Sequence, residues 1–257
     1  MIVPTMASIS VVIPVFNDAV MLRACLDALA AQSRPADEII VVDNGCTDDS
    51  ADVGRAGGAR VISQPVRGIL PATVAGFDAA TGDILARLDA DSVPPPVWLE
   101  RVEHLLGTTG GPSAVTGPGD FYGAGRLVCW LGRVVYIGGY FAVIGALLGH
   151  PPLFGSNMAI TSTTWSRIRP LVDPTLSEVH DDLYLSFRIQ PDMAVRYDSN
   201  LRVGISARPF DNWSGLSRRL VWAWRTLRIN RGSPSPRERR AARRASRRAS
   251  RRAPTRP

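Results

Sequence analysis

The sequence contains no lysine, so all 30 of its basic residues are arginine. Such a complete preference is typical of biased codon usage, and arginine content alone therefore does not indicate a nucleic-acid-binding protein. The three cysteines (Cys25, Cys46 and Cys129) are widely spaced and form no C-x-x-C pair. This excludes a disulfide-stapled domain, argues against a cysteine-based zinc site and favours a reducing compartment. With 257 residues, 45% of them hydrophobic and 21% charged, the chain is instead expected to fold as one α/β domain or two small lobes.

The beginning of the chain lacks the features of a signal peptide. Met1–Ser8 has neither a basic region nor a small-residue cleavage site, so we expect a cytoplasmic protein. A long apolar segment, 127–149, contains Arg133, and its uncharged part is shorter than the about 20 residues that a spanning helix needs. We therefore expect a buried or interfacial helix pair in this segment, with a true membrane span as the alternative.

The net charge of +7 is concentrated at the C-terminal end. Residues 231–257 contain 11 arginines and one glutamate, so residues 1–230 are net negative. Large apolar residues are missing from 231–257, which predicts disorder in solution. Its arginine pairs repeat every four residues, and on a helix they would form a basic stripe suited to an anionic membrane surface. A solvated extension without a partner is the alternative, and the lack of interleaved aromatics argues against nucleic acid.

The first hundred residues alternate between β-branched runs and amphipathic segments. This alternation predicts βαβ units and a parallel sheet, with the ligand crevice at the carboxyl ends of the strands. The runs that predict strands are Ile9–Pro14, Glu38–Asp43, Arg60–Ser63 and Asp83–Leu88. The segments that predict helices are Asp18–Ala31 and Gly68–Ala80, with a further Trp/Arg-rich helix over Gly215–Ile229.

Polar and acidic residues gather where the predicted strands end. Buried parallel strands have no structural need for acids at that edge, although Asp and Asn are also common in turns and helix caps. Three such loops at one edge favour a binding site over three unrelated turns. The residues are Asn17 and Asp18 after the first strand, Asp43 and Asn44 after the second, and Asp89 and Asp91 after the fourth.

The pair Asp89 and Asp91 is the most specific of these features. Two carboxylates two residues apart in a turn can bind one hard cation, which the phosphates of a nucleotide then share. Mg²⁺ and Mn²⁺ suit such oxygen ligands, so we expect one of these ions as the cofactor. Arg67, before a predicted helix, could reach a phosphate, although a simple helix-entry turn explains it equally well.

Three segments together resemble the family 2 glycosyltransferases with a GT-A fold: Val11–Asp18, Ile40–Asp48 and Ala79–Asp91. Gly155–Ile160 and His180–Ser186 resemble later family motifs more loosely. The resemblance implies an α/β fold with a mostly parallel sheet, flanking helices and a smaller acceptor lobe. It further implies a nucleotide-sugar-binding half over 7–115 and an acceptor-binding half over 116–230 that includes the apolar segment. Composition separates the basic tail 231–257 from these two halves.

The resemblance also implies roles for individual residues. Asp91 matches the metal ligand, and Asp89 matches the partner that contacts the ribose or the metal. Asp182 matches the general base, but Asp181 stands where the family has Glu, which leaves the identity of the base ambiguous. On the acceptor side we expect Asn157 and His180. The nucleotide-binding positions are Pro14, Val15, Asn17, Asp18 and Asp43.

The implied reaction is an inverting, metal-dependent transfer of one sugar from a UDP- or GDP-sugar. The acceptor would be a hydroxyl or carboxylate of a lipid or cell-envelope precursor, such as a polyprenyl phosphate, a carotenoid acid or a glycolipid. The Q-x-x-R-W signature of processive synthases is absent, which favours single-sugar transfer. A nucleotidyltransferase would need a glycine-rich loop after the first strand, which Pro14–Asp18 lacks. A catalytically inactive scaffold that acts through its basic tail would predict an eroded set of acids, and the set is intact.

Overall fold

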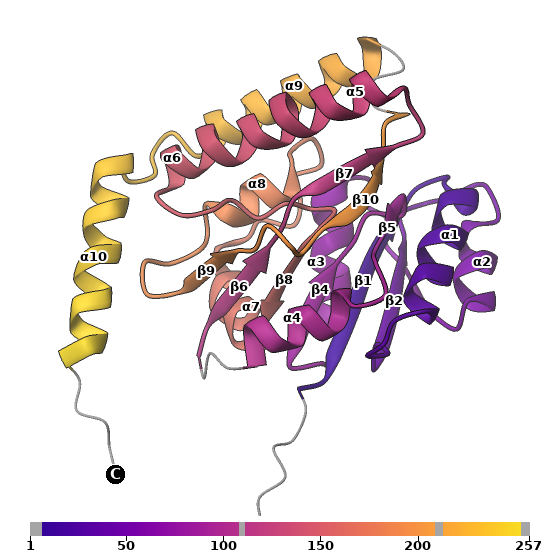
Figure 1. The fold of residues 1–257 in the computed structure, drawn as a ribbon, viewed down its shortest axis with the longest axis horizontal. Helices are drawn as coiled ribbons and strands as arrows, with labels where there is room; N and C mark the ends of the chain where they lie inside the picture. Colours follow the sequence, from indigo (N-terminus) through magenta and orange to yellow (C-terminus); the bar gives the residue numbers. More distant parts are fainter. Residues whose placement is uncertain (1–6, 108–110, 209–212, 253–257) are drawn as a thin grey trace, which may run out of the picture.

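The computed structural model describes residues 7–107, 111–208 and 213–252. A seven-stranded sheet in the order β3-β2-β1-β4-β8-β6-β9 forms its centre, and a three-stranded sheet in the order β5-β10-β7 lies beside it (Figure 1). The strands are β1 (Ile9–Val15), β2 (Glu38–Asp43), β3 (Arg60–Ser63), β4 (Ile84–Arg87), β5 (Ser92–Val93), β6 (Ser113–Thr116), β7 (Gly119–Tyr122), β8 (Met158–Thr161), β9 (Ala194–Tyr197) and β10 (Val203–Ser206).

Helices cover both faces of the large sheet and continue along one edge of the molecule (Figure 1). Those of the first half are α1 (Ala19–Ala30), α2 (Ser50–Ala56), α3 (Ile69–Ala79) and α4 (Trp98–Gly107). Those of the second half are α5 (Arg126–Leu131), α6 (Gly145–Leu148), α7 (Ser162–Ile168), α8 (Asp181–Ser186), α9 (Trp213–Ile229) and α10 (Pro236–Arg252).

The alternation of side chains along β1 divides the core between the two faces. Val11 and Ile13 pack with α1 and α4 in one cluster, whereas Val12 packs with α3 and α8 in the other. All three side chains are fully buried. This is why the strand is apolar except for Ser10, which is buried and donates to Glu38: a strand covered by helices on both faces has no solvent-facing position.

The predicted parallel arrangement of the first four strands is confirmed. β1 pairs in parallel with both β2 and β4, and β2 pairs in parallel with β3. The carboxyl ends of β1, β2 and β4 therefore meet at one edge, where the polar residues of the sequence were expected. β8 then pairs antiparallel with β4 and β6, so the second half of the chain extends the same sheet.

The apolar segment is one helix and not the expected helix pair. Arg126–Leu148 runs without interruption through α5, two π-helical turns (Gly132–Ile137 and Tyr140–Ile144) and α6. It is 23 residues long with mean hydropathy 1.7, which by length and composition would suffice to cross a membrane. Gly138, Gly139 and Gly145 have helical backbone angles and Gly149 ends the helix with a φ of 73°, because a glycine lowers helix stability without preventing the helix.

The basic tail also differs from the expectation of disorder, since α10 is a helix over Pro236–Arg252. Alanine and arginine have high helix propensity, and Ser235 with Glu238 forms a capping box at the helix start. Two arginines dock α10 on the body: Arg240 donates to the carbonyl oxygen of Ala146 over 2.9 Å, and Arg243 to that of Met193 over 3.0 Å. Residues 253–257 lie outside the described part of the chain.

Candidate functional site

The loop after β2 is shaped by the polar residues predicted there. Asp43 accepts a hydrogen bond from the backbone N–H of Cys46 over 2.7 Å. Asn17, which follows β1, accepts one from the N–H of Thr47 over 2.7 Å and adopts a left-handed backbone conformation with φ of 49°. Asparagine tolerates this conformation better than most residues. The ends of β1 and β2 are therefore tied together at the edge of the sheet.

Asn44, the residue after Asp43, connects the loop after β2 to the segment that follows β3. Its buried amide donates to the carbonyl oxygens of Gln64 and Val66 over 2.8 and 2.7 Å, and its oxygen accepts from the N–H of Gly68 over 2.8 Å. This fixes the segment that carries Arg67. The Arg67 guanidinium carbon lies 3.3 Å from the centre of the half-exposed Phe16 ring. Phe16 directly follows β1, so this contact lies at the same edge of the sheet.

Arg87 is the buried centre of the site. It lies on β4 with 1% of its side chain exposed, and its guanidinium bridges Asp89 over 2.7 Å and Asp181 over 3.1 Å. The Ser156 hydroxyl also donates to Asp89. Although burial alone would raise the pKa of Asp89, its pKa lies below the ordinary value because Arg87 and Ser156 stabilise the carboxylate. Asp89 is thereby held ionised.

Asp91 and Asp18 lie beside this cluster, and both are bordered by Arg208. Arg208 forms two hydrogen bonds to Asp18, over 2.9 and 2.5 Å, and its guanidinium lies 3.5 Å from Asp91. Burial and the nearby Asp89 charge raise the pKa of Asp91 to about 6. Three carboxylates therefore converge at the carboxyl ends of β1 and β4, with an excess of negative charge that a cation would relieve.

The two acids at the start of α8 have different surroundings. Asp181 is buried, accepts a hydrogen bond from the Thr73 hydroxyl over 2.6 Å and pairs with Arg87. Asp182 is half-buried and accepts from the N–H of Gly155 over 2.9 Å. A side chain at Gly155 would collide with the Arg87 guanidinium, so glycine permits this close approach. Burial and the neighbouring Asp181 raise the pKa of Asp182.

The expectation that Asn157 contacts the acceptor is corrected. Its side chain is fully buried, accepts from the Trp98 indole over 2.9 Å and donates to the carbonyl oxygens of Pro118 and Leu201. These bonds use its polar atoms within the core and leave none for a substrate. His180 lies nearer the acids, but its Nε2 donates to the carbonyl oxygen of Arg219 over 2.9 Å, so its ring is engaged with α9.

Pro14 and Val15 form the end of β1, where the Val15 side chain is 3% exposed. Only their backbone can therefore contact a ligand. The site also contains residues that the sequence analysis did not single out, namely Arg87, Ser156, Thr73 and Arg208. Arg87 had a signal in the sequence, because a charged residue inside a buried strand needs a partner. Arg208 had none, since it lies outside every motif.

The carboxylates at the strand ends offer the oxygen donors that a divalent cation requires. Within the described residues, no group of three or more His, Cys, Asp or Glu side chains is arranged to hold a metal ion. Mg²⁺ and Mn²⁺ do not need such a cage, because they commonly use one or two carboxylates and complete their shell with phosphate oxygens and water. Asp89 and Asp91 fit this pattern, and the raised pKa of Asp91 is consistent with a position where positive charge is missing.

Residues 10–162 match the family model "Glycosyl transferase family 2". The chain belongs to this family. The match covers β1 to β8 and therefore the strand ends that carry Asn17, Asp43, Asp89 and Asp91. It confirms the family resemblance that the sequence motifs suggested.

Curated relatives match this family 2 chain over about two fifths of its length. Glycosyltransferase AglE of Haloferax volcanii is 34% identical over 114 residues, which are 41% of this chain and 38% of that protein. An undecaprenyl-phosphate 4-deoxy-4-formamido-L-arabinose transferase of Klebsiella pneumoniae is 36% identical over 109 residues, which are 38% of this chain and 33% of that protein. The matched segment therefore spans little more than a third of the length of these relatives.

Solved structures match the fold over most of the chain. The mannosyltransferase PcManGT of Pyrobaculum calidifontis, in complex with GDP-Man and Mn²⁺, has a TM-score of 0.64 at 19% identity and covers 99% of this chain and 78% of that one. Glucosyl-3-phosphoglycerate synthase of Mycobacterium tuberculosis, with Mn²⁺, UDP-Glc and phosphoglyceric acid, has a TM-score of 0.61 at 23% identity and covers 89% and 81%. The α/β fold of this family 2 chain is thus the GT-A fold that its sequence predicted.

Proposed function

We propose that this chain is an inverting, metal-dependent glycosyltransferase that moves one sugar from a nucleotide-sugar to an acceptor. The observation that carries the proposal is the cluster of Asp18, Asp89 and Asp91 at the carboxyl edge of the sheet, linked through buried Arg87 to the Asp181–Asp182 pair. The donor-binding edge is thereby joined through one guanidinium to Asp181, the neighbour of the candidate base Asp182. Family membership supports this assignment.

The donor half of the proposal assigns Asp91 and Asp89 as ligands of Mn²⁺ or Mg²⁺. When bound, the cation would neutralise charge on the leaving diphosphate. Asn17, Asp18 and Asp43 would hold the base and ribose together with the backbone of Pro14 and Val15. Arg67, on the Phe16 ring, would lie against a phosphate. Structural neighbours crystallised with UDP-Glc and with GDP-Man support a nucleoside diphosphate donor.

The chemical half of the proposal assigns Asp182 as the general base. It is less buried than Asp181, its pKa is raised, and the Gly155 N–H orients it. Where the attacking acceptor oxygen carries a proton, as in a hydroxyl or a monoprotonated phosphate, Asp182 would take that proton as the oxygen bonds to the anomeric carbon. The bond from that carbon to the diphosphate breaks with its electron pair on the leaving group. Because one attack from the opposite face suffices, the configuration inverts. Asp181 and Arg87 would position the base.

The acceptor is proposed to be a lipid or cell-envelope precursor at the cytoplasmic side of a membrane. Polyprenyl phosphates, carotenoid acids and glycolipids all fit an acceptor-binding half that includes the apolar helix Arg126–Leu148. Curated relatives named as undecaprenyl-phosphate sugar transferases support the first of these classes. His180, between α8 and α9, would lie on the acceptor side.

A transfer assay tests the proposed reaction. Purified protein is incubated with UDP- and GDP-sugars, Mn²⁺ and undecaprenyl phosphate, and the lipid product is separated and its anomeric configuration determined by NMR. We expect one sugar per lipid, with inverted configuration and complete loss of product on addition of EDTA. Product with retained configuration, or formed equally well in EDTA, would contradict the proposed mechanism.

A further inference from the structure

The helix Arg126–Leu148 has two apolar faces, only one of which is packed. Its inner face contacts the body through Tyr140, which donates to the carbonyl oxygen of Leu153 over 2.6 Å, and through Phe141, whose ring lies 4.8 Å from that of Tyr197. Ile137 is buried on the same side. These contacts hold the inner face of the helix against the protein.

The outer face carries large apolar side chains where a helix on a soluble domain normally has polar ones. Leu127, Val135 and Val143 are 68%, 65% and 67% exposed. We define the outer face as these three together with Trp130, Leu131 and Val134, all exposed. Their spacing of three or four residues places most of them on one stripe, and contiguous exposed apolar surface of this kind marks a site of interaction.

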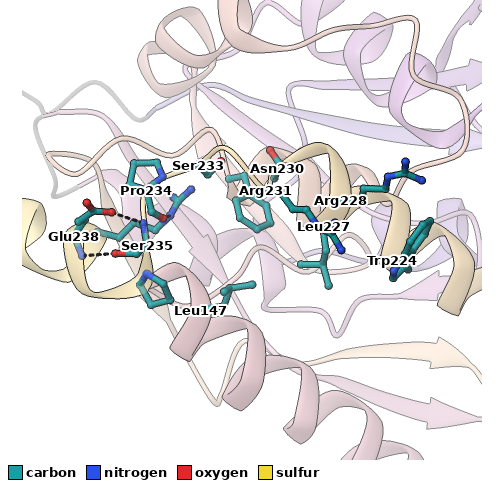
Figure 2. Close-up of a pocket in the computed structure, with 13 residues that line it drawn as sticks. Leu147, Trp224, Leu227, Arg228, Asn230, Arg231, Ser233, Pro234, Ser235 and Glu238 are labelled. Atoms are coloured by element: carbon teal, nitrogen blue, oxygen red, sulfur yellow. Dashed lines mark hydrogen bonds between the residues drawn. The ribbon is translucent and has the colours of Figure 1, made fainter.

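A second helix with exposed apolar side chains shares a cavity with the first. Leu147 of α6 and Trp224 and Leu227 of α9 line a cavity of about 630 Å³, shown in Figure 2. Leu220, Val221 and Trp224 of α9 are exposed. In Figure 1 both helices extend along the same edge of the molecule.

Positive charge borders this apolar edge. Arg228 and Arg231 line the cavity between α6 and α9, and α10 follows with exposed Arg237, Arg244 and Arg248. The only acid on α10 is Glu238, which accepts a hydrogen bond from the Ser235 N–H at the helix start over 2.6 Å. Apolar side chains flanked by arginines suit the headgroup region of a bilayer that contains anionic lipids.

We infer that the outer face of Arg126–Leu148 and the exposed side of α9 dock on an anionic bilayer, with the helix axis parallel to the membrane plane. A spanning orientation would require the helix to leave the contacts of Tyr140 and Phe141, whereas docking keeps them. The protein thus lies on the membrane and does not cross it. Docking needs no catalysis, so this inference stands or falls independently of the proposed function.

Vesicle co-sedimentation of the full chain tests this surface. We compare Val135→Glu/Val143→Glu with a control pair, Ala56→Glu/Val97→Glu, whose residues are exposed at the end of α2 and just before α4. The vesicles contain phosphatidylcholine alone or with phosphatidylglycerol. We expect the wild type and the control to bind the mixed vesicles, more weakly at high salt, and the outer-face variant to bind at least about tenfold more weakly.

Equal binding of the two variants, or no binding of the wild type, would overturn the inference. A wild type that is dimeric in sedimentation velocity, with a monomeric outer-face variant and no vesicle binding, would overturn it in favour of a second copy of the chain. Nucleotide binding is measured on the same samples. Vesicle binding without nucleotide binding would contradict the proposed function and leave the docking surface intact.

Discussion

Replacing Asp182 by Asn is expected to lower kcat by about 10²- to 10⁴-fold, the usual range for loss of a general base. Asparagine has nearly the same shape and can still accept from the Gly155 N–H, so affinity for nucleotide and metal should change by no more than about twofold. Transfer kinetics and calorimetric titration with the nucleotide measure the two effects separately. Loss of nucleotide binding together with activity would contradict the assignment of Asp182 as base.

A pH profile gives the same prediction a second readout. A base acts only when it is unprotonated, and burial with the adjacent Asp181 raises the pKa of Asp182. The rate of the wild type should therefore fall on the acid side at a pH above the ordinary range of an aspartate. The exposed Asp192→Asn serves as the control, since Asp192 pairs with Arg167 at the surface and contacts none of the site residues named above. Its activity and pH profile should match the wild type.

Replacing Arg87 by Met is expected to lower the free energy of unfolding by about 3–5 kcal/mol. The guanidinium is the ionic partner of both Asp89 and Asp181, and breaking a buried pair leaves an uncompensated charge in the core. Urea unfolding measures the change. Arg167→Met, which removes a half-exposed pair with Asp192, is the matched control and should cost less than about 1 kcal/mol.

Arg87→Lys provides a milder variant if Arg87→Met does not fold. Lysine keeps the charge but cannot place two nitrogens in the fixed fork that reaches both acids. We expect a stability between those of the wild type and of Arg87→Met. Equal stability of all Arg87 and Arg167 variants would show that the bridge contributes nothing to the fold.

The first half of the fold was predictable because its β-branched strands alternate regularly with amphipathic helices along the sequence. Glu38–Asp43 and Arg60–Ser63 are β2 and β3 to the residue. The four-residue strands that follow α4, namely β6, β7, β8, β9 and β10, were not predicted. Their pairing joins segments far apart in sequence, and a run of four residues carries too little periodicity to reveal it.

The site residues that were predicted from the sequence are acids that follow strands. Most of the residues that were missed reach the site from segments that are distant in the sequence. Asp89 and Asp91 could be found because they end β4, but Arg208 comes from beyond β10 and reaches Asp18 only in the folded chain. Asn157 was misjudged because a loop amide can serve the core as well as a ligand. The prediction of disorder for 231–257 did not take into account the capping box at the start of α10 or the contact of Arg243 with the body of the protein.

Thermal unfolding with nucleotides tests the central claim, a metal-dependent nucleotide site at Asp89 and Asp91. Wild type, Asp91→Asn and the exposed control Asp52→Asn are each heated with UDP or GDP, with and without Mn²⁺. A nucleotide at a hundred times its Kd should stabilise the wild type and the control by about 2.7 kcal/mol, a shift of several degrees in Tm, only with Mn²⁺. Asp91→Asn should show no shift. No shift of the wild type with any nucleotide, or an equal shift in Asp91→Asn, would contradict the account.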